Sequence, residues 1–87
     1  MKIEVGDMIR ARAETHGDFC TNSHVSQCIK AILRDERGWE RLKTTQQEAL
    51  DHICGKIGMI MAGDPDHADH WIDIAGYAQL AAMEGKE

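Results

Sequence analysis

Residues 45–63 read TQQEALDHICGKIGMIMAG, and this stretch contains the clearest helical pattern of the 87-residue chain. Thr45 and Glu48 have the spacing of a capping box, in which two side chains accept hydrogen bonds from free backbone amides at a helix start. Apolar residues then recur at helical spacing up to Gly63: Ala49, Leu50, Ile53, Cys54, Ile57, Ile60 and Met61. The stretch therefore predicts a helix with one buried face.

Weaker patterns on both sides of this stretch predict three more helices. The first covers about residues 7–14 and ends before Gly17, because glycine readily adopts the left-handed conformation that closes a helix. The second starts at one of the N-cap candidates in 21–23 and is closed by Gly38. The last runs over about 66–83, after an Asp-Pro turn. Short connections favour an all-α, four-helix bundle-like fold, with a single domain over 1–87.

The expected core is the apolar stripe of each helix. In the second helix the stripe comprises Val25, Cys28, Ile29, Ile32 and Leu33, and in the last helix it comprises Trp71, Ile74, Ala75, Ala78, Ala81 and Ala82. Trp39 and Leu42 are expected to pack the connection between the second and third helices onto this core. Small residues along the last helix would let a neighbouring helix approach closely.

Large aliphatic and aromatic residues are scarce for a four-helix core. Leu, Ile, Val and Phe together number sixteen, under a fifth of the chain. We therefore expect a homo-oligomer, most simply a dimer, in which a subunit interface supplies missing burial. The expected interface involves the Ala-rich face of the last helix or the Met-rich end of the helix over 45–63.

Charge and cysteine content restrict the class of protein. A formal charge of −5 argues against a surface that grips nucleic acid or an anionic membrane. Apolar runs are too short to span a bilayer, and acidic residues stand where a signal peptide needs an apolar core. Three cysteines without such a signal indicate free thiols in a reducing compartment, so we expect a cytoplasmic protein.

One run of residues has the chemistry of a metal site. His16, Cys20, His24 and Cys28 are spaced by four and would line one face of an unbroken helix, with ligands that suit zinc. Gly17 and the capping residues at 21–23 interrupt such a helix. The simpler interpretation places Cys28 on the core stripe and the two histidines in solvent.

Two groups of acids are further candidates for a site. Asp69 and Asp73 lie one turn apart on the last helix, and Glu48 and Asp51 form an i, i+3 pair of the kind that holds magnesium when a second pair faces it. Helix capping is the simpler explanation of both Glu48 and Asp69. Asp73 lies mid-helix among apolar residues, and it either faces solvent or is held by a partner, for which Lys56 is the natural candidate and Arg12 and His16 the alternatives.

The last helix also resembles a known group of proteins. Asp69, Trp71 and the run 73–78 (DIAGYA) match the D-x-W-x-D-I-A-G-Y-A ending of small phage and prophage proteins of unassigned function. Arg12 followed by 16–19 (HGDF) looks like the R-x-x-x-Y-G-D-F motif of the same proteins, with His16 in place of Tyr. Lys56-Ile57 followed by Gly63 looks like their K-I-x-R-x-x-x-G step. The resemblance covers most of the chain.

That family is distantly similar to MazG-type all-α nucleoside-triphosphate pyrophosphohydrolases, and the similarity implies two alternatives. In one, the chain is an enzyme in which Mg²⁺ is held by four acids: Asp69, Asp73, Glu48 and Asp51. In the other, which we favour because the acids are few, an oligomer binds a nucleotide or a host protein without chemistry or cofactor. The nucleotide site would then draw on the residues that the motifs mark: Arg12, His16, Asp18, Lys56, Asp73 and Tyr77, with Tyr77 or Trp71 packed on the base.

Overall fold

The computed structural model describes residues 5–84, and this part of the chain contains four α-helices and no strand. The helices are α1 (Val5–His16), α2 (Phe19–Asp35), α3 (Thr44–Ala62) and α4 (Ala68–Glu84). A short 3-10 helix, η1 (Arg37–Arg41), connects α2 to α3. The predicted all-α class is confirmed.

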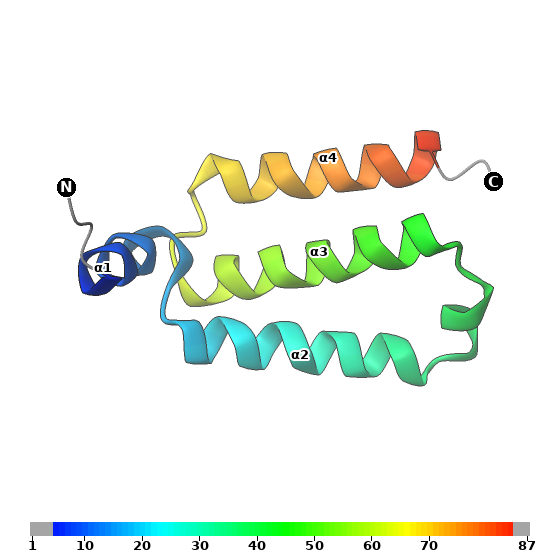
Figure 1. The fold of residues 1–87 in the computed structure, drawn as a ribbon, viewed down its shortest axis with the longest axis horizontal. Helices are drawn as coiled ribbons and strands as arrows, with labels where there is room; N and C mark the ends of the chain where they lie inside the picture. Colours follow the sequence, from blue (N-terminus) through cyan, green and yellow to red (C-terminus); the bar gives the residue numbers. More distant parts are fainter. Residues whose placement is uncertain (1–4, 85–87) are drawn as a thin grey trace.

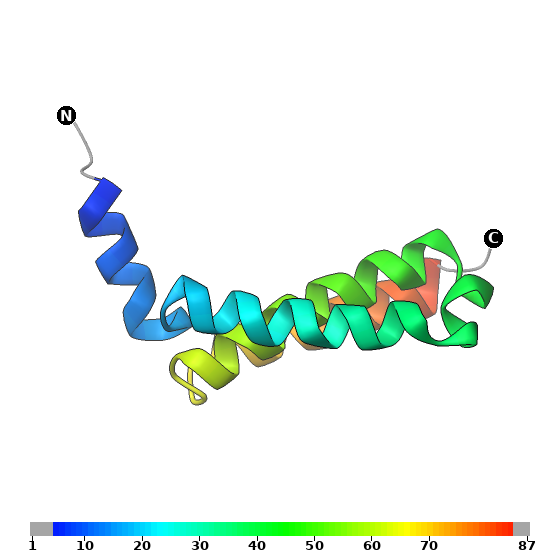
Figure 2. The same ribbon diagram turned by 90° about the horizontal axis from the view of Figure 1, so that it is seen from below.

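Helices α2, α3 and α4 lie side by side in one antiparallel layer with α3 in the middle (Figure 1). Helix α1 leaves this layer at the end where α2 begins and projects away from it (Figure 2). Helix α3 thus has a neighbour on each of two sides. Among the described helices, none lies along either broad face of the layer.

Three glycines allow the turn between α1 and α2 to pack against α3. Gly17 has φ +74°, and a Cβ there would lie 2.2 Å from the carbonyl carbon of Ala62. A Cβ at Gly63 would lie 2.3 Å from the Thr15 carbonyl oxygen, and one at Gly58 equally close to that of Asn22. Side chains at these positions would force the helices apart. The predicted role of Gly17 as a helix terminator is confirmed.

The ends of α2 differ from the prediction. The Asp18 carboxylate accepts a hydrogen bond from the Thr21 amide at 2.8 Å, so Asp18 is the N-cap and the helix begins at Phe19 rather than at 21–23. The helix ends at Asp35, and Gly38 lies inside η1 instead of closing α2. Gln47 donates to the Trp39 carbonyl at 3.1 Å, which fastens η1 to α3. Trp39 and Leu42 are half-buried, as expected of a packed connection.

The starts of α3 and α4 also need correction. The capping box over 45–48 is wrong: the N-cap is Lys43, whose amide donates to the Gln46 side-chain oxygen at 2.9 Å. Glu48 then lies beyond the capping positions and is exposed. Helix α4 begins at Ala68 rather than near Asp66, because the Asp64 carboxylate accepts from the Asp66 amide and holds those residues in a turn. Gly63 ends α3, as predicted.

Burial within the described chain is much lower than the apolar stripes predict. The fully buried hydrophobic side chains are Ala49 and Cys54 alone. Trp71, predicted to be core, is 54% exposed, and Ala75, Ala78, Ala82, Cys28 and Ile32 are also exposed. The buried residue of α4 is instead His70, at 1%. The stripes lack burial because none of the described helices covers the face on which they lie.

Candidate functional site

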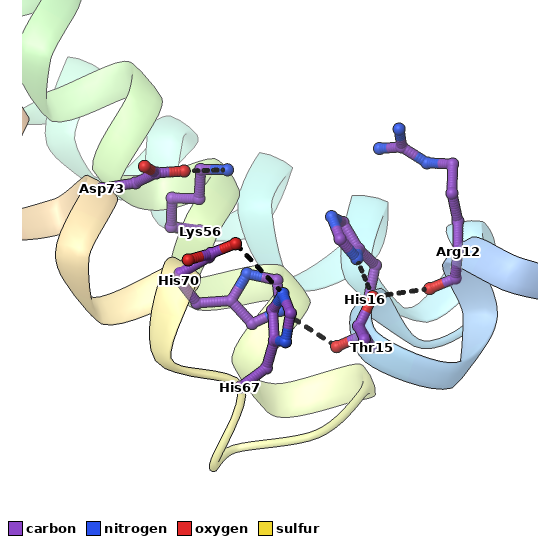
Figure 3. Close-up of polar contacts among 8 residues, drawn as sticks. Arg12, Thr15, His16, Lys56, His67, His70 and Asp73 are labelled. Atoms are coloured by element: carbon purple, nitrogen blue, oxygen red, sulfur yellow. Dashed lines mark hydrogen bonds and ion pairs between the residues drawn. The ribbon is translucent and has the colours of Figure 1, made fainter.

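Three histidines meet where α1, the α3–α4 turn and α4 come together (Figure 3). His16 ends α1, His67 precedes α4, and His70 lies in the first turn of α4. The His70 ring centroid is 4.7 Å from that of His16 and 4.7 Å from that of His67, with edge-to-face geometry in both pairs. We call these three residues the histidine junction.

The backbone carbonyl of Thr15 binds this junction together. His70 donates to it from Nε2 at 2.9 Å, which requires the proton on Nε2 because a carbonyl oxygen only accepts. The Asp64 amide donates to the same oxygen at 3.0 Å. One carbonyl at the end of α1 therefore holds both the turn and the start of α4.

His16 lies in an environment that disfavours its charged form. Its Nδ1 shares a hydrogen bond with the Thr15 hydroxyl, which also donates to the Arg12 carbonyl. Burial lowers the pKa of His16, and the nearby ionisable groups lower it further: His70, Arg12, Lys56 and His67. The junction is therefore built around a neutral His16.

Lys56 and Asp73 form an ion pair beside the junction, with Nζ and Oδ2 2.8 Å apart (Figure 3). The side chain of Lys56 is 19% exposed and that of Asp73 is 45% exposed. The hydrogen bond from Lys56 holds the pKa of Asp73 below its usual range. The prediction that Lys56 is the partner of Asp73 is confirmed, and the pair ties α3 to α4.

A second cluster lies further along the α3–α4 seam, away from the histidine junction. The rings of His52 and Tyr77 stack in parallel with centroids 4.4 Å apart. Arg34 pairs with Asp51 at 2.7 Å, and its guanidinium lies over the Trp39 ring at 4.6 Å. These five residues line an open hollow of about 620 Å³, together with Glu48, Leu80 and others.

Asp51 has one oxygen without a partner in this second cluster. Its Oδ2 accepts from Arg34, whereas its Oδ1 is buried and has no hydrogen bond within the described residues. Cys54 lies one turn further along α3, where burial and then the charge of Asp51 raise the pKa of its thiol. Cys54 is thus a neutral packing residue.

The structure distributes the predicted ligand residues over three places. Lys56, Asp73 and His16 lie at or beside the histidine junction. Arg12 and Asp18 line a separate, mainly apolar hollow of about 430 Å³ between α1 and α2, which His16 also borders. Tyr77 belongs to the second cluster. No one hollow collects all six.

The four acids of the magnesium hypothesis are not gathered either. Glu48 lies 3.6 Å from His52 and Asp69 lies 3.8 Å from His67, while Asp51 and Asp73 have the partners given above. The described range 5–84 has no group of three His, Cys, Asp or Glu side chains arranged to hold a metal ion. Each acid faces a base instead of another acid.

The turn at Gly17 interrupts the cysteine and histidine run of the zinc hypothesis, but the simpler interpretation holds only for His24, because His16 is half-buried in the histidine junction. His16 lies before the turn at Gly17, whereas Cys20, His24 and Cys28 follow on α2. The Cys28 sulfur lies 3.8 Å from His24 Nδ1, and Cys20 and Cys28 are exposed. Cys28 is therefore not on the buried side of α2.

Sequence reasoning missed His67, His52 and Arg34, and it considered His70 beside Asp69 and Asp73 without predicting that His70 is buried. A signal for His70 was present, because His70, Asp73, Tyr77 and Ala81 follow the 3–4 spacing of one helix face. That face has polar members, so apolar periodicity favours the more apolar stripe beside it as the buried one. The residues that point from α4 toward α3 are these mixed ones.

Comparisons of this chain with protein-family models, with curated proteins and with solved structures find no match. The resemblance to small phage proteins therefore rests on the sequence motifs. Within residues 5–84, no helix has the length and apolar character needed to cross a membrane.

Proposed function

We propose that this chain is a small helical accessory protein that acts as an oligomer and binds a partner molecule without transforming it. One observation carries the proposal: two hydrophobic side chains are buried, while ten large ones in the described chain are at least half exposed. Apolar surface on this scale marks a site of protein association.

Energetics support association. A chain of this size has little stability to spare even with a well-filled core. Covering exposed isoleucine, methionine and tryptophan side chains would add about 25 cal/mol for each Å² removed from water. Association therefore stabilises the fold and covers the apolar surface in one step.

The pairing of the acids supports binding rather than hydrolysis. Magnesium-assisted attack on a nucleotide needs several carboxylates directed at one point. Asp51 and Asp73 are each occupied by a cation of the chain itself. The motif resemblance to phage and prophage proteins agrees with an accessory role, and we include that origin in the proposal.

Light scattering of the full chain across a concentration series tests the proposal. We expect a mass of twice 9.7 kDa or more at micromolar concentration. A mass of 9.7 kDa that persists to high micromolar concentration, with the helices intact by circular dichroism, would refute it.

A nucleotide is a second candidate partner, favoured by the hollow around His52 and Tyr77. The stacked rings offer a surface for a base, and Lys56 lies one helical turn along the seam from His52. Trp39 lines the hollow, and Trp71 does not, so Trp71→Phe leaves one tryptophan as a reporter.

Titration of that variant with a panel of nucleoside triphosphates is expected to change Trp39 fluorescence saturably. Release of pyrophosphate is measured in parallel with and without Mg²⁺. Magnesium-dependent release would favour the MazG-type alternative over binding. A fluorescence signal that no nucleotide changes would remove the nucleotide from the candidate partners.

A further inference from the structure

The neighbours of α3 leave one broad face of that helix uncovered. Contacts with α2 come from positions 51 and 58, and contacts with α4 come from positions 52 and 56. With 3.6 residues per turn, a third set of α3 residues lies between these two sets on one face of the layer. This set consists of Leu50, Ile53, Ile57 and Met61.

The two outer helices extend this surface. The hollow around His52 and Tyr77 lies on the opposite broad face of the layer. Arg34 of α2, which pairs with Asp51, and Leu80 of α4 both line that hollow. Helical periodicity then places the remaining apolar residues of both helices on the same face as Leu50 and Ile57. They are Val25, Ile29 and Ile32 on α2, and Trp71, Ile74, Ala75 and Ala78 on α4. We call this surface, with its α3 members, the aliphatic face.

The aliphatic face contains most of the residues whose spacing predicts burial. Ile32, Met61 and Trp71 nevertheless are 64%, 68% and 54% exposed, one on each helix of the layer. Amphipathic helices place such stripes against another layer of structure. The described residues form no second layer that could cover these stripes.

The accessible surface of the chain indicates how much is left uncovered. It measures 6,482 Å², whereas a monomer of 9.7 kDa typically exposes about 5,100 Å². The excess of about 1,400 Å² exceeds the roughly 800 Å² that each partner contributes to an interface of standard size. The excess is shared between the aliphatic face and α1, which projects from the layer with no buried residue, and it is large enough to include one side of a standard interface.

We infer that a second copy of this chain packs on the aliphatic face and forms the second layer of the fold. The inference rests on the proposed oligomer and names its surface. No member of the face carries a charge, so two copies with a net charge of −5 can meet there without opposing like charges. A two-fold axis would set the same face of each copy against the other.

Two matched substitutions test which surface is used. Ile32 lies on the aliphatic face and is 64% exposed, whereas Ile72 lies on the outer edge of α4 and is 62% exposed. We expect Ile32→Glu to raise the dimer dissociation constant about tenfold or more, and Ile72→Glu to leave it unchanged. Mass is measured by light scattering, with circular dichroism as the check on folding.

Methionine oxidation provides a test on the unaltered protein. Met61 lies on the aliphatic face and Met83 near the outer edge of α4, with 68% and 61% exposure in one chain. Brief peroxide treatment of the oligomer, read by peptide mass spectrometry, is expected to oxidise Met61 several-fold more slowly than Met83. This result does not depend on whether Ile32→Glu folds.

The results of these experiments distinguish failure of the aliphatic face as the interface from failure of the proposed oligomer. A monomeric wild-type chain overturns both. An oligomer that Ile32→Glu leaves intact, or in which Met61 and Met83 oxidise equally fast, overturns the aliphatic face and retains the oligomer. Slow oxidation of Met61 in a monomer purified with another protein would show that a different partner occupies the face, and would also overturn the inference.

Discussion

His70 donates a hydrogen bond from Nε2 to the backbone carbonyl of Thr15 at 2.9 Å, across 55 residues of sequence. Because the Asp64 amide donates to the same oxygen, this carbonyl fixes α4 and the preceding turn to the end of α1. Helix α1 has no fully buried residue of its own. Its position therefore depends on the histidine junction and on the close packing of Gly17 and Gly63.

Replacing His70 by Leu should weaken the fold. The substitution places an apolar side chain in a site that is 1% exposed and removes the donor to Thr15. Because the Thr15 carbonyl still accepts from the Asp64 amide, loss of this hydrogen bond should lower the free energy of unfolding by about 0.5–1.5 kcal/mol. Urea denaturation measures the loss. His24→Leu, at an exposed position on α2, is the control and should change stability by less than about 0.5 kcal/mol.

Mild acid should weaken the fold through His16. Its folded pKa lies below the usual 6.5, so the unfolded chain binds protons more readily around that pH. The stabilising contribution is complete above pH 6.5 and decreases as the pH falls below that value. Urea midpoints at pH 7.5, 6.5 and 5.5 should therefore decrease in that order. His16→Gln should flatten this dependence, and an equally steep dependence in the variant would show that another group is responsible.

A second decrease is expected at lower pH. A hydrogen bond from the Thr21 amide lowers the pKa of Asp18, and one from Lys56 lowers that of Asp73, both from a usual 3.8. Stability from these carboxylates is present above that pH and is lost as the pH falls below it. In Asp18→Ala the acid-induced loss should be smaller, and at neutral pH the variant should be less stable than the parent chain because α2 loses its N-cap.

Lys56 was predictable as the natural partner of Asp73 because a carboxylate beside Trp71, Ile72 and Ile74 favours a basic partner, and Lys56 lies on the preceding helix. Gly17 and Gly63 were predictable as helix terminators for a related reason, since few residues other than glycine close a helix so readily. In both cases a local chemical requirement leaves few candidates in the chain. These are the parts of the fold and of the site that the sequence determines alone.

The side of α4 that faces α3 was not predictable in this way. Apolar periodicity identifies a surface that is suited to burial, without saying what covers it. Trp71 and Ala75 follow that periodicity yet are exposed, whereas His70 and Tyr77 face inward. The histidine junction escaped prediction because its members come from three separate segments, which only the turn at Gly17 and the end of α3 bring together.

Asp73→Asn distinguishes a structural pair from a ligand site. With Asp73 half exposed, Lys56 loses its partner but keeps some access to water, so the fall in unfolding free energy should be smaller than for a fully buried pair. Lys56→Met and the double variant complete a cycle, and a structural pair should show favourable coupling. Unchanged stability together with lost nucleotide binding would assign Asp73 to a ligand site instead.

Alanine at Gly17 and at Gly55 should have opposite effects on stability. At Gly17, φ is +74° and a Cβ would lie 2.2 Å from Ala62, so alanine must both adopt a left-handed conformation and displace α3. The conformation alone costs about 1–2 kcal/mol, and the steric overlap adds to it. Gly55 lies inside α3 with nothing within 4 Å of an added Cβ, so alanine there should stabilise the helix by about 0.5–1 kcal/mol. Urea denaturation at pH 7.5 measures the stability of both variants. A Gly17→Ala variant as stable as the parent chain would show that the close packing of the α1–α2 turn against α3 is wrong, regardless of the result for Gly55→Ala.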